Sequence, residues 1–444
     1  MLKITFIGAG STVFAKNILG DTMLTESLRD AHIALYDIDA DRLEESRMMV
    51  ENLNASINEK RAKVTAHLGL ENRKTALKDA DFVVNAIQVG GYRPSTVIDF
   101  EIPRKYGLRQ TIADTLGVGG IFRGLRTIPV MVAFAKEMEE VCPDALLLNY
   151  TNPMAIVTGA VLQATDIATV GLCHSVQACV PGLLKSLDMA DLIDRTQWQI
   201  AGINHMGWLL ELTVDGQDIY PEVKKRAFEK NDKAIAAGET HWDMVRYEIM
   251  RHFGHYVTES SEHSAEYSPY WIKSAFPELI ERYNIPLDEY PRRCERQIEH
   301  WEMRKGEIIS NASLAHERTH EYGSYIMDAV VTDTPTRIHG NVLNEGCIPN
   351  LPDDAVVEVA SLVDRNKVQP TLVAPLPPQC AALNMTNINV QLLTIDAALT
   401  GSRERVYHAA YLDPHTAAEL PLAQIRSLCD DLIEAHGDML PPLK

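Results

Sequence analysis

The chain has 444 residues, of which 46% are hydrophobic and 23% are charged, so it carries enough apolar material for a large core. Because a single core rarely exceeds roughly 250–300 residues, this length predicts two closely packed domains. The net charge of −19 argues against nucleic acid or an anionic membrane as a partner, since phosphate binding needs clustered Lys and Arg. A small neutral ligand fits this charge better.

The cysteines and the first residues both predict a cytoplasmic protein. The seven cysteines are odd in number and scattered, and none forms a CxxC pair, so a disulfide framework is not expected. The N-terminus runs directly into a strand pattern rather than into a basic and apolar leader. No apolar run reaches the length that spans a membrane.

The first segment predicts the turn of a dinucleotide-binding fold. Lys3–Ile7 is a short apolar run typical of a buried parallel strand. Gly8 and Gly10 permit a tight turn and a close approach of the backbone to a pyrophosphate, and Ser11 precedes a helical pattern over residues 12–24. Val13 stands where the third glycine of the usual fingerprint would be, so this turn alone is weak evidence.

A second strand, predicted over His32–Tyr36, strengthens this interpretation because it ends at Asp37. An acid at this position binds the ribose 2′-hydroxyl and repels a 2′-phosphate, which favours NAD over NADP. The alternative is a surface aspartate in a turn. The order of glycine turn, helix, second strand and acid favours the dinucleotide site.

The next elements extend an alternating pattern of strands and helices. Helices are predicted over 41–57 and 121–141, and strands over 63–67, 81–86, 146–154 (running out into Asn-Pro) and 168–172. This rhythm predicts an α/β fold with a doubly wound, Rossmann-like parallel sheet in residues 1–182.

Past about Leu183, strands and helices no longer alternate regularly in the predicted pattern. Residues 198–212 are strand-like, residues 356–360 predict a strand, and helices are expected over 243–253, 288–301, 323–331, 389–399 and 423–435. Without a clean linker, we expect a mixed α+β domain over residues 183–444 that packs intimately on the first and carries substrate, metal and oligomerisation surfaces.

Two polar segments indicate a catalytic site. Asp114 lies in a glycine-rich loop over 110–120, and such loops bind ligands at the carboxyl ends of parallel strands. Cys173 directly follows a predicted strand, and His205 ends a Gly-Ile-Asn-His sequence. A thiolate with an imidazole suits Zn, Fe or Mn, and two protein ligands leave an open, catalytic coordination sphere. The alternatives are a buried apolar thiol and a hydrogen-bonded core histidine.

Five ordered motifs together resemble glycoside hydrolase family 4, the NAD- and metal-dependent glycosidases, over nearly the whole chain. These motifs are Phe6–Ser11, Asp114 with Gly117–Gly120, Asn149–Met154, Gly171–Ser175 and Gly202–His205. Within that family, residues 258–267 and 407–410 are similar to the α-galactosidases of the melibiase type.

The resemblance implies hydrolysis of a small α-galactoside through a temporary oxidation. NAD oxidises C3 of the sugar, the C2 proton is removed, the aglycone is eliminated and water adds at C1. The C2 proton becomes acidic only beside a carbonyl group, and Mn²⁺ or another divalent cation stabilises the resulting charge. Because the family is commonly oligomeric, a homodimer or homotetramer is expected.

The resemblance also implies roles for individual residues. Cys173 and His205 match the metal ligands, and Asn152 with Asn204 matches the substrate-binding residues. The glycine turn, Asp37 and Asn149 match the NAD site.

The catalytic groups follow from the same comparison. His174 stands where the phospho-sugar branch has an aspartate acid, so the acid here would be an imidazolium and a 6-phosphosugar is disfavoured. Asp114 matches a carboxylate beside the base. Tyr267 is the candidate base, with His263 and Glu262 as alternatives.

Other functions remain open on the residues alone. An α-glucosidase or α-galacturonidase of the same family would carry the same motifs. A 2-hydroxy-acid dehydrogenase shares the glycine turn and Asp37 but leaves Cys173 without a role, and an NAD-sensing regulator would bind the dinucleotide without needing metal.

Overall fold

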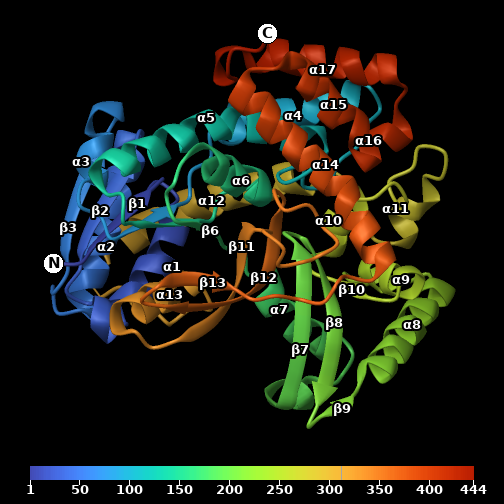
Figure 1. The fold of residues 1–444 in the computed structure, drawn as a ribbon, viewed down its shortest axis with the longest axis horizontal. Coiled ribbons are helices and arrows are strands. Elements are labelled where there is room, and N and C mark those ends of the chain that lie inside the picture. The colour runs from blue at the N-terminus through green and yellow to red at the C-terminus, as the bar shows by residue number, and fades with distance from the viewer. Residues whose placement is uncertain (312) are drawn as a thin grey trace.

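A mixed sheet of 13 strands runs through the computed structural model, which describes residues 1–311 and 313–444 (Figure 1). Six strands are parallel in the order β3-β2-β1-β4-β5-β6, which is the doubly wound order. Their bounds are β1 Lys3–Ile7, β2 His32–Asp37, β3 Lys63–Leu68, β4 Phe82–Asn85, β5 Leu146–Asn149 and β6 Thr169–Gly171. The order in which successive strands join the sheet reverses between β1 and β4, so a ligand crevice is expected there.

Helices pack on both faces of this parallel part: α1 Thr12–Met23 and α2 Ala40–Ile57 belong to one apolar cluster, and α3 Arg73–Leu77, α5 Gly117–Val141 and α6 Met154–Ala164 contribute to another. Helix α4 Val97–Lys105 packs against α5, and α7 Ser175–Ser186 packs against strands of the second half. Of the described helices, only α5 is long and apolar enough to span a membrane, but 78% of its apolar window is buried in the molecule. It therefore serves as a core helix.

The C-terminal half continues the same sheet with antiparallel strands. Strand β11 pairs with β6 through Asn341 and Gly171, and β12 pairs with β7 through Glu358 and Gly202. These strands are β7 Thr196–Ile203, β8 Met206–Val214, β9 Gln217–Asp218, β10 Tyr256–Val257, β11 Thr336–Leu343, β12 Val356–Asp364 and β13 Lys367–Pro370. The predicted α/β fold, with a Rossmann-like first part and a mixed second part, is confirmed.

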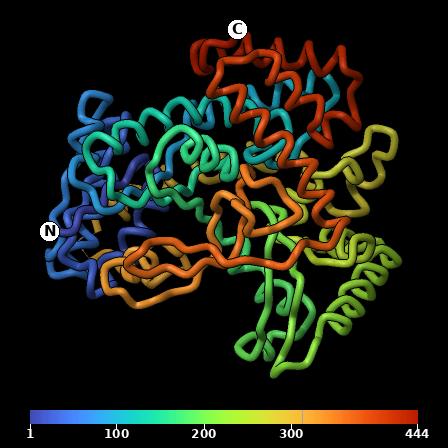
Figure 2. Tube along the Cα trace, in the orientation of Figure 1, coloured from blue at the N-terminus to red at the C-terminus, as the bar shows by residue number. Residues whose placement is uncertain are grey.

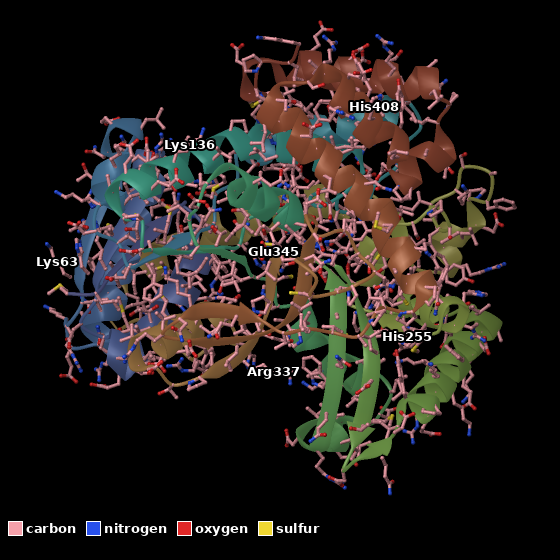
Figure 3. All side chains as sticks on the ribbon, in the orientation of Figure 1. Lys63, Lys136, His255, Arg337, Glu345 and His408 are labelled. Atoms are coloured by element: carbon pink, nitrogen blue, oxygen red, sulfur yellow. The ribbon has the colours of Figure 1, made fainter. Side chains whose placement is uncertain are left out.

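The remaining helices pack against both halves, with α12 against α2 and α13 against α1, and side chains fill the space between the layers (Figures 2 and 3). They are α8 Tyr220–Ala237, α9 Met244–Phe253, α10 Ser261–Glu266, α11 Glu278–Arg282, α12 Glu289–Ser310, α13 Tyr322–Thr332, α14 Pro378–Thr400, α15 Arg403–Leu412, α16 Pro414–Glu419 and α17 Leu422–His436. Helix α17 lies beside α4, and α15 packs against α17 and α5 (Figure 1). A buried network ties them together: Arg126 of α5 donates two hydrogen bonds to Asp99 of α4, which His436 of α17 also contacts at 2.9 Å.

Several helices and strands begin or end at other residues than the sequence predicted. The strand predicted over 146–154 ends at Asn149, because the Asn-Pro sequence turns directly into α6. The helix expected from 389 begins at Pro378. Helix α8 and strand β11 were not predicted. Helix α7 runs continuously past residue 182, and the division into domains at that point stays a prediction.

Candidate active site

A cavity of about 590 Å³ opens at the carboxyl ends of the parallel strands. Ser11 follows β1, Ile87 follows β4, Thr151 follows β5 and Cys173 follows β6, and all four residues line the cavity. The expected crevice between β1 and β4 is therefore present. The second half closes it with side chains from α9, α10, α12 and the β7–β8 turn.

The glycine turn lies at one end of this cavity. Gly8 has a φ of +83°, and a Cβ there would come within 2.9 Å of the Ala86 carbonyl group, so only glycine fits. The Gly10 N–H donates to Asp37 Oδ2 at 2.6 Å, and Asp37 Oδ1 accepts from two further backbone N–H groups. The turn, the acid and the start of α1 are thus assembled as a dinucleotide site requires.

Two predicted asparagines lie elsewhere. Asn149 is buried in the core, where it accepts from Asn85 Nδ2 at 2.8 Å and donates to the Thr158 hydroxyl at 3.1 Å. Asn204 is fully buried in the β7–β8 turn, and neither of its amide atoms has a hydrogen-bond partner among the described residues. The structure does not place either side chain on the cavity wall.

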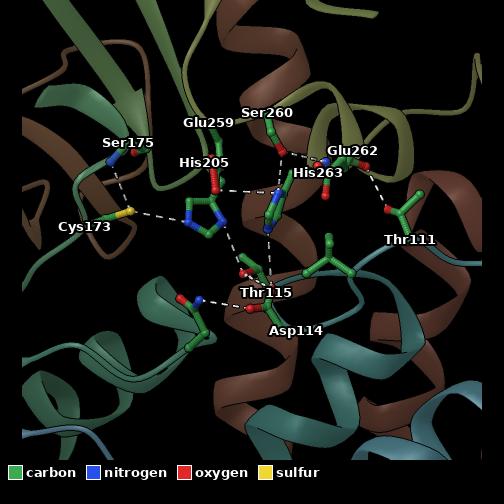
Figure 4. Close-up of polar contacts among 12 residues, drawn as sticks. Thr111, Asp114, Thr115, Cys173, Ser175, His205, Glu259, Ser260, Glu262 and His263 are labelled. Atoms are coloured by element: carbon green, nitrogen blue, oxygen red, sulfur yellow. Dashed lines mark hydrogen bonds and ion pairs between the residues drawn. The ribbon is translucent and has the colours of Figure 1, made fainter. Parts of the chain in front are cut away.

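Cys173 and His205 meet across the cavity, with Sγ 3.4 Å from Nε2 (Figure 4). His205 occupies the two-residue turn between β7 and β8 with a φ of +62°. Gly202 permits this hairpin, since a Cβ there would lie 2.5 Å from the Met206 carbonyl oxygen. Residues 32 positions apart are thereby brought into contact.

The other ring nitrogen of His205 is held from behind. Nδ1 lies 3.2 Å from the Thr115 hydroxyl and 3.1 Å from the Tyr267 hydroxyl, so Nε2 is left to face Cys173. Burial lowers the pKa of His205, which keeps the ring neutral at neutral pH. Burial also raises the pKa of the Cys173 thiol to about 11.

This pair fits one metal ion. Sulfur and nitrogen ligands at about 2.3 and 2.0–2.1 Å from zinc are roughly 3.5 Å apart at a tetrahedral angle. The observed separation of 3.4 Å matches that span. Among the described residues there is no group of three His, Cys, Asp or Glu side chains that could hold a metal ion, so an ion held by this pair would keep open coordination positions.

Asp114 organises the opposite wall. Its Oδ2 accepts from the Asn152 amide at 3.1 Å, and its Oδ1 accepts from the Thr115 hydroxyl at 2.8 Å (Figure 4). His263 Nε2 faces the same carboxylate at 3.8 Å. Although burial raises it, the pKa of Asp114 ends well below its usual value because of His263. The loop before Asp114 is anchored by Glu266, whose carboxylate accepts the N–H groups of residues 111–113.

His174 lies on the cavity wall beside Cys173. Its side chain is 65% exposed, and its Nδ1 lies 3.5 Å from the carboxylate of Glu321, which precedes α13. This carboxylate raises the pKa of His174 to about 9, so the ring is protonated at neutral pH.

The three candidate bases occupy different places. His263 lines the cavity and contacts the Ser260 hydroxyl at 2.8 Å. Tyr267 is buried, and its hydroxyl contacts His205 from behind. Glu262 is paired with Arg293 at 2.9 Å.

Other cavity residues were not predicted. Glu259 has a φ of +71° and lies 3.6 Å from His263. Arg123 of α5 donates to the Tyr290 hydroxyl at 3.1 Å. An arginine within the apolar first half of α5, where Arg126 is the other charged residue, was a usable signal for Arg123, because a buried charge needs a partner.

Comparisons with known proteins agree with this geometry. Residues 3–189 match the sequence family described as family 4 glycosyl hydrolase, and residues 200–416 match its C-terminal domain. The chain is 59% identical to an α-galactosidase of Bacillus subtilis (strain 168) over 444 residues, covering 100% of both chains. It is 32% identical to an α-galactosidase of Rhizobium meliloti (strain 1021), covering 99% of this chain and 89% of that one. A solved 6-phospho-α-glucosidase from gut microorganisms, in complex with NAD and Mn²⁺, has the same fold, with a TM-score of 0.81, 22% identity and coverage of 100% of both chains.

Proposed function

The chain belongs to family 4 of the glycosyl hydrolases, and on that premise we propose that it hydrolyses terminal α-galactosides with NAD⁺ and a divalent cation such as Mn²⁺. The 59% identity to an α-galactosidase over the full length supports the galactoside specificity. Membership of a glycosidase family does not support a 2-hydroxy-acid dehydrogenase or an NAD-sensing regulator. The observation that carries the mechanism is the contact of Cys173 with His205 in a cavity that is also lined by Ser11, directly after the glycine turn.

The cofactors supply chemistry that protein side chains lack. When bound, NAD⁺ would take hydride from C3 and return it later, and the cation would stabilise negative charge on the sugar oxygens. Gly8, Gly10 and Ser11 would hold the pyrophosphate at the start of α1, and Asp37 the ribose hydroxyls. Cys173 Sγ and His205 Nε2 would hold the cation.

The substrate would be oriented by Asn152. Its amide donates to Asp114, which fixes the side chain in one direction. The amide oxygen then presents an acceptor for a sugar hydroxyl. Asn149 and Asn204, which were predicted to bind the cofactor and the substrate, lie in the core, and we propose that they support the site from there.

Acid and base are assigned to separate sides of the metal pair. His174, protonated beside Glu321, would donate a proton to the glycosidic oxygen. We propose Tyr267 as the base for the C2 proton. Burial and the carboxylates of Asp114 and Glu266 raise the pKa of Tyr267 well above its usual value. When His205 presents its Nε2 lone pair to the cavity, its Nδ1 carries the proton, and this N–H would donate to the Tyr267 oxygen and offset part of that rise.

The base assignment is tested by isotope exchange. Tyr267→Phe should abolish the exchange of the C2 proton with solvent, whereas His263→Gln should retain it. The opposite pattern would assign the base to His263, and retention in both variants would refute both assignments.

We further propose a cytoplasmic homodimer or homotetramer that acts on small α-glycosides, with residues 1–182 as the NAD-binding domain and 183–444 as the domain for substrate and assembly. The free thiols of all seven cysteines are consistent with a reducing compartment. Light scattering of the purified protein measures the assembly directly.

The activity is tested with nitrophenyl α-galactoside after removal of bound dinucleotide and metal. Hydrolysis should require both added NAD⁺ and Mn²⁺, and full activity without either one would refute the mechanism. A parallel assay with the α-glucoside and the α-galacturonide decides between the galactosidase and its two alternatives within the family.

A further inference from the structure

A tryptophan at the cavity wall is exposed although it is the largest aromatic side chain there. Trp242 lies between α8 and α9, lines the cavity, and has 51% of its surface exposed. Leaving such a ring in water forgoes the free energy of burying it. An exposed aromatic ring in a ligand cavity is therefore a candidate contact surface.

The guanidinium group of Arg246 packs against one face of the Trp242 ring. The guanidinium carbon of Arg246 lies 4.8 Å from the centre of the Trp242 ring and 4.6 Å from that of Tyr256, so it is stacked between the two. Arg246 is buried, donates to Asp243 Oδ1 and also donates to the backbone carbonyl of Glu259. Since Arg246 covers one face of the indole, the exposed half includes the other face.

The position of Trp242 indicates which part of the substrate its ring would contact. Helices α8 and α9 lie on the side of the molecule away from β1 and α1, where the dinucleotide would bind (Figure 1). In a pyranose, C1 and C3 lie on opposite sides of C2. A sugar whose C3 faces the dinucleotide therefore directs the bond at C1, and the leaving group on it, away from α1.

We propose that the outward face of Trp242 binds the leaving-group sugar of a disaccharide α-galactoside; this inference rests on the proposed function. One face of a pyranose carries several C–H groups, which pack on an aromatic ring and displace water from both surfaces. The second sugar is thereby positioned without contributing to the chemistry at C2 and C3. Trp242 is then a determinant of specificity for the leaving group.

The test compares two substrates with the same galactose and different leaving groups. The Trp242→Ala variant should have a kcat/KM for melibiose lower by roughly 10-fold to 100-fold, because the leaving group loses its aromatic contact. Its kcat/KM for methyl α-galactoside should change less than about threefold, since a methyl group is too small to cover the ring. The retained methyl galactoside activity shows that the variant is folded. Trp242→Phe should recover much of the melibiose activity, and glucose should inhibit Trp242→Ala more weakly than the wild type.

Phe276→Ala is the matched control, because Phe276 is also an exposed aromatic residue (55%) but lies outside the cavity. Its two kcat/KM values should equal those of the wild type. Equal losses on both substrates in Trp242→Ala, or no loss on melibiose, would overturn the inference. A change of oligomeric state in Trp242→Ala, with loss on both substrates, would overturn it in favour of a subunit contact. A wild-type protein that cleaves neither galactoside would overturn the proposed function itself.

Discussion

Replacing Cys173 by serine should weaken metal binding and change how metal binding depends on pH. Changes around a metal ligand already cost about 10–100-fold in affinity, so loss of the ligand itself should cost roughly 100-fold, or about 2.8 kcal/mol. The thiolate is also the form that binds the metal. Burial raises the pKa of the Cys173 thiol to about 11, so the ion must displace a proton at neutral pH.

The second ligand should release no proton. Burial lowers the pKa of His205, so its ring is already neutral at pH 7. The wild-type affinity for Mn²⁺ should therefore rise about tenfold for each pH unit between pH 6.5 and 8.5, with about one proton released per ion. In Cys173→Ser this pH dependence should disappear.

Titration calorimetry of the metal-free protein in two buffers with different ionisation enthalpies measures both the affinity and the proton release. Cys142→Ser is the control, since Cys142 is a buried thiol at the end of α5, outside the cavity. An unchanged Mn²⁺ affinity in Cys173→Ser, or the same pH slope as in the wild type, would mean that Cys173 is not a ligand.

Three further variants test the cofactor site and the buried ion pairs. Gly8→Ala should lower the affinity for NAD⁺, measured by calorimetry, by tenfold or more, because the added Cβ would meet backbone atoms at 2.9 Å in a turn with a φ of +83°. His263→Gln should lower the thermal midpoint most below pH 6.5. Burial lowers the pKa of His263, but the carboxylates of Glu259 and Asp114 raise it by more, to about 9. The charged ring therefore stabilises the fold by roughly 3 kcal/mol below pH 6.5, and this stabilisation is lost as the pH rises through 9. Asp99→Asn should lower the free energy of unfolding by about 3–5 kcal/mol, because it leaves the buried guanidinium of Arg126 without its carboxylate.

Each of these three predictions has a control variant or an outcome that would contradict it. Gly216→Ala shares the positive φ (+80°) but meets no atom within 4 Å, so an equal loss of NAD⁺ affinity there would indicate general strain. A stability difference in His263→Gln that grows above pH 9 would contradict the assigned sign. Asp430→Asn breaks a half-exposed bridge to Arg403 and should change stability by less than about 1 kcal/mol; an equal effect from both aspartates would refute the role of burial.

The parallel half of the fold was predictable because its signals are local. The strands before Gly8 and Asp37 are short apolar runs that end in turn residues, and both were found within a residue of their observed bounds. Strand β11 escaped prediction because His339 and Asn341, although buried, interrupt the apolar pattern of the sequence. Helix α8 is largely polar and exposed, so its sequence resembles a loop.

The sequence identified Cys173 and His205 as candidate metal ligands, but it did not predict how they come into contact. The resemblance singled out Cys173 and His205, while their contact depends on the hairpin that places His205 in a two-residue turn. Glu259 became visible only when tertiary packing brought its segment to the cavity, whereas Arg123 had a local signal in the sequence that was not used. The burial of Tyr267 behind the imidazole likewise depends on how α10 packs, which no local pattern reports.

The proposed mechanism requires that the sugar is briefly oxidised so that its C2 proton can leave. Hydrolysis of the α-galactoside in D₂O, followed by NMR of the galactose released, tests this directly. The mechanism predicts deuterium at C2 of the product. Galactose that retains its original hydrogen at C2 throughout turnover would contradict it.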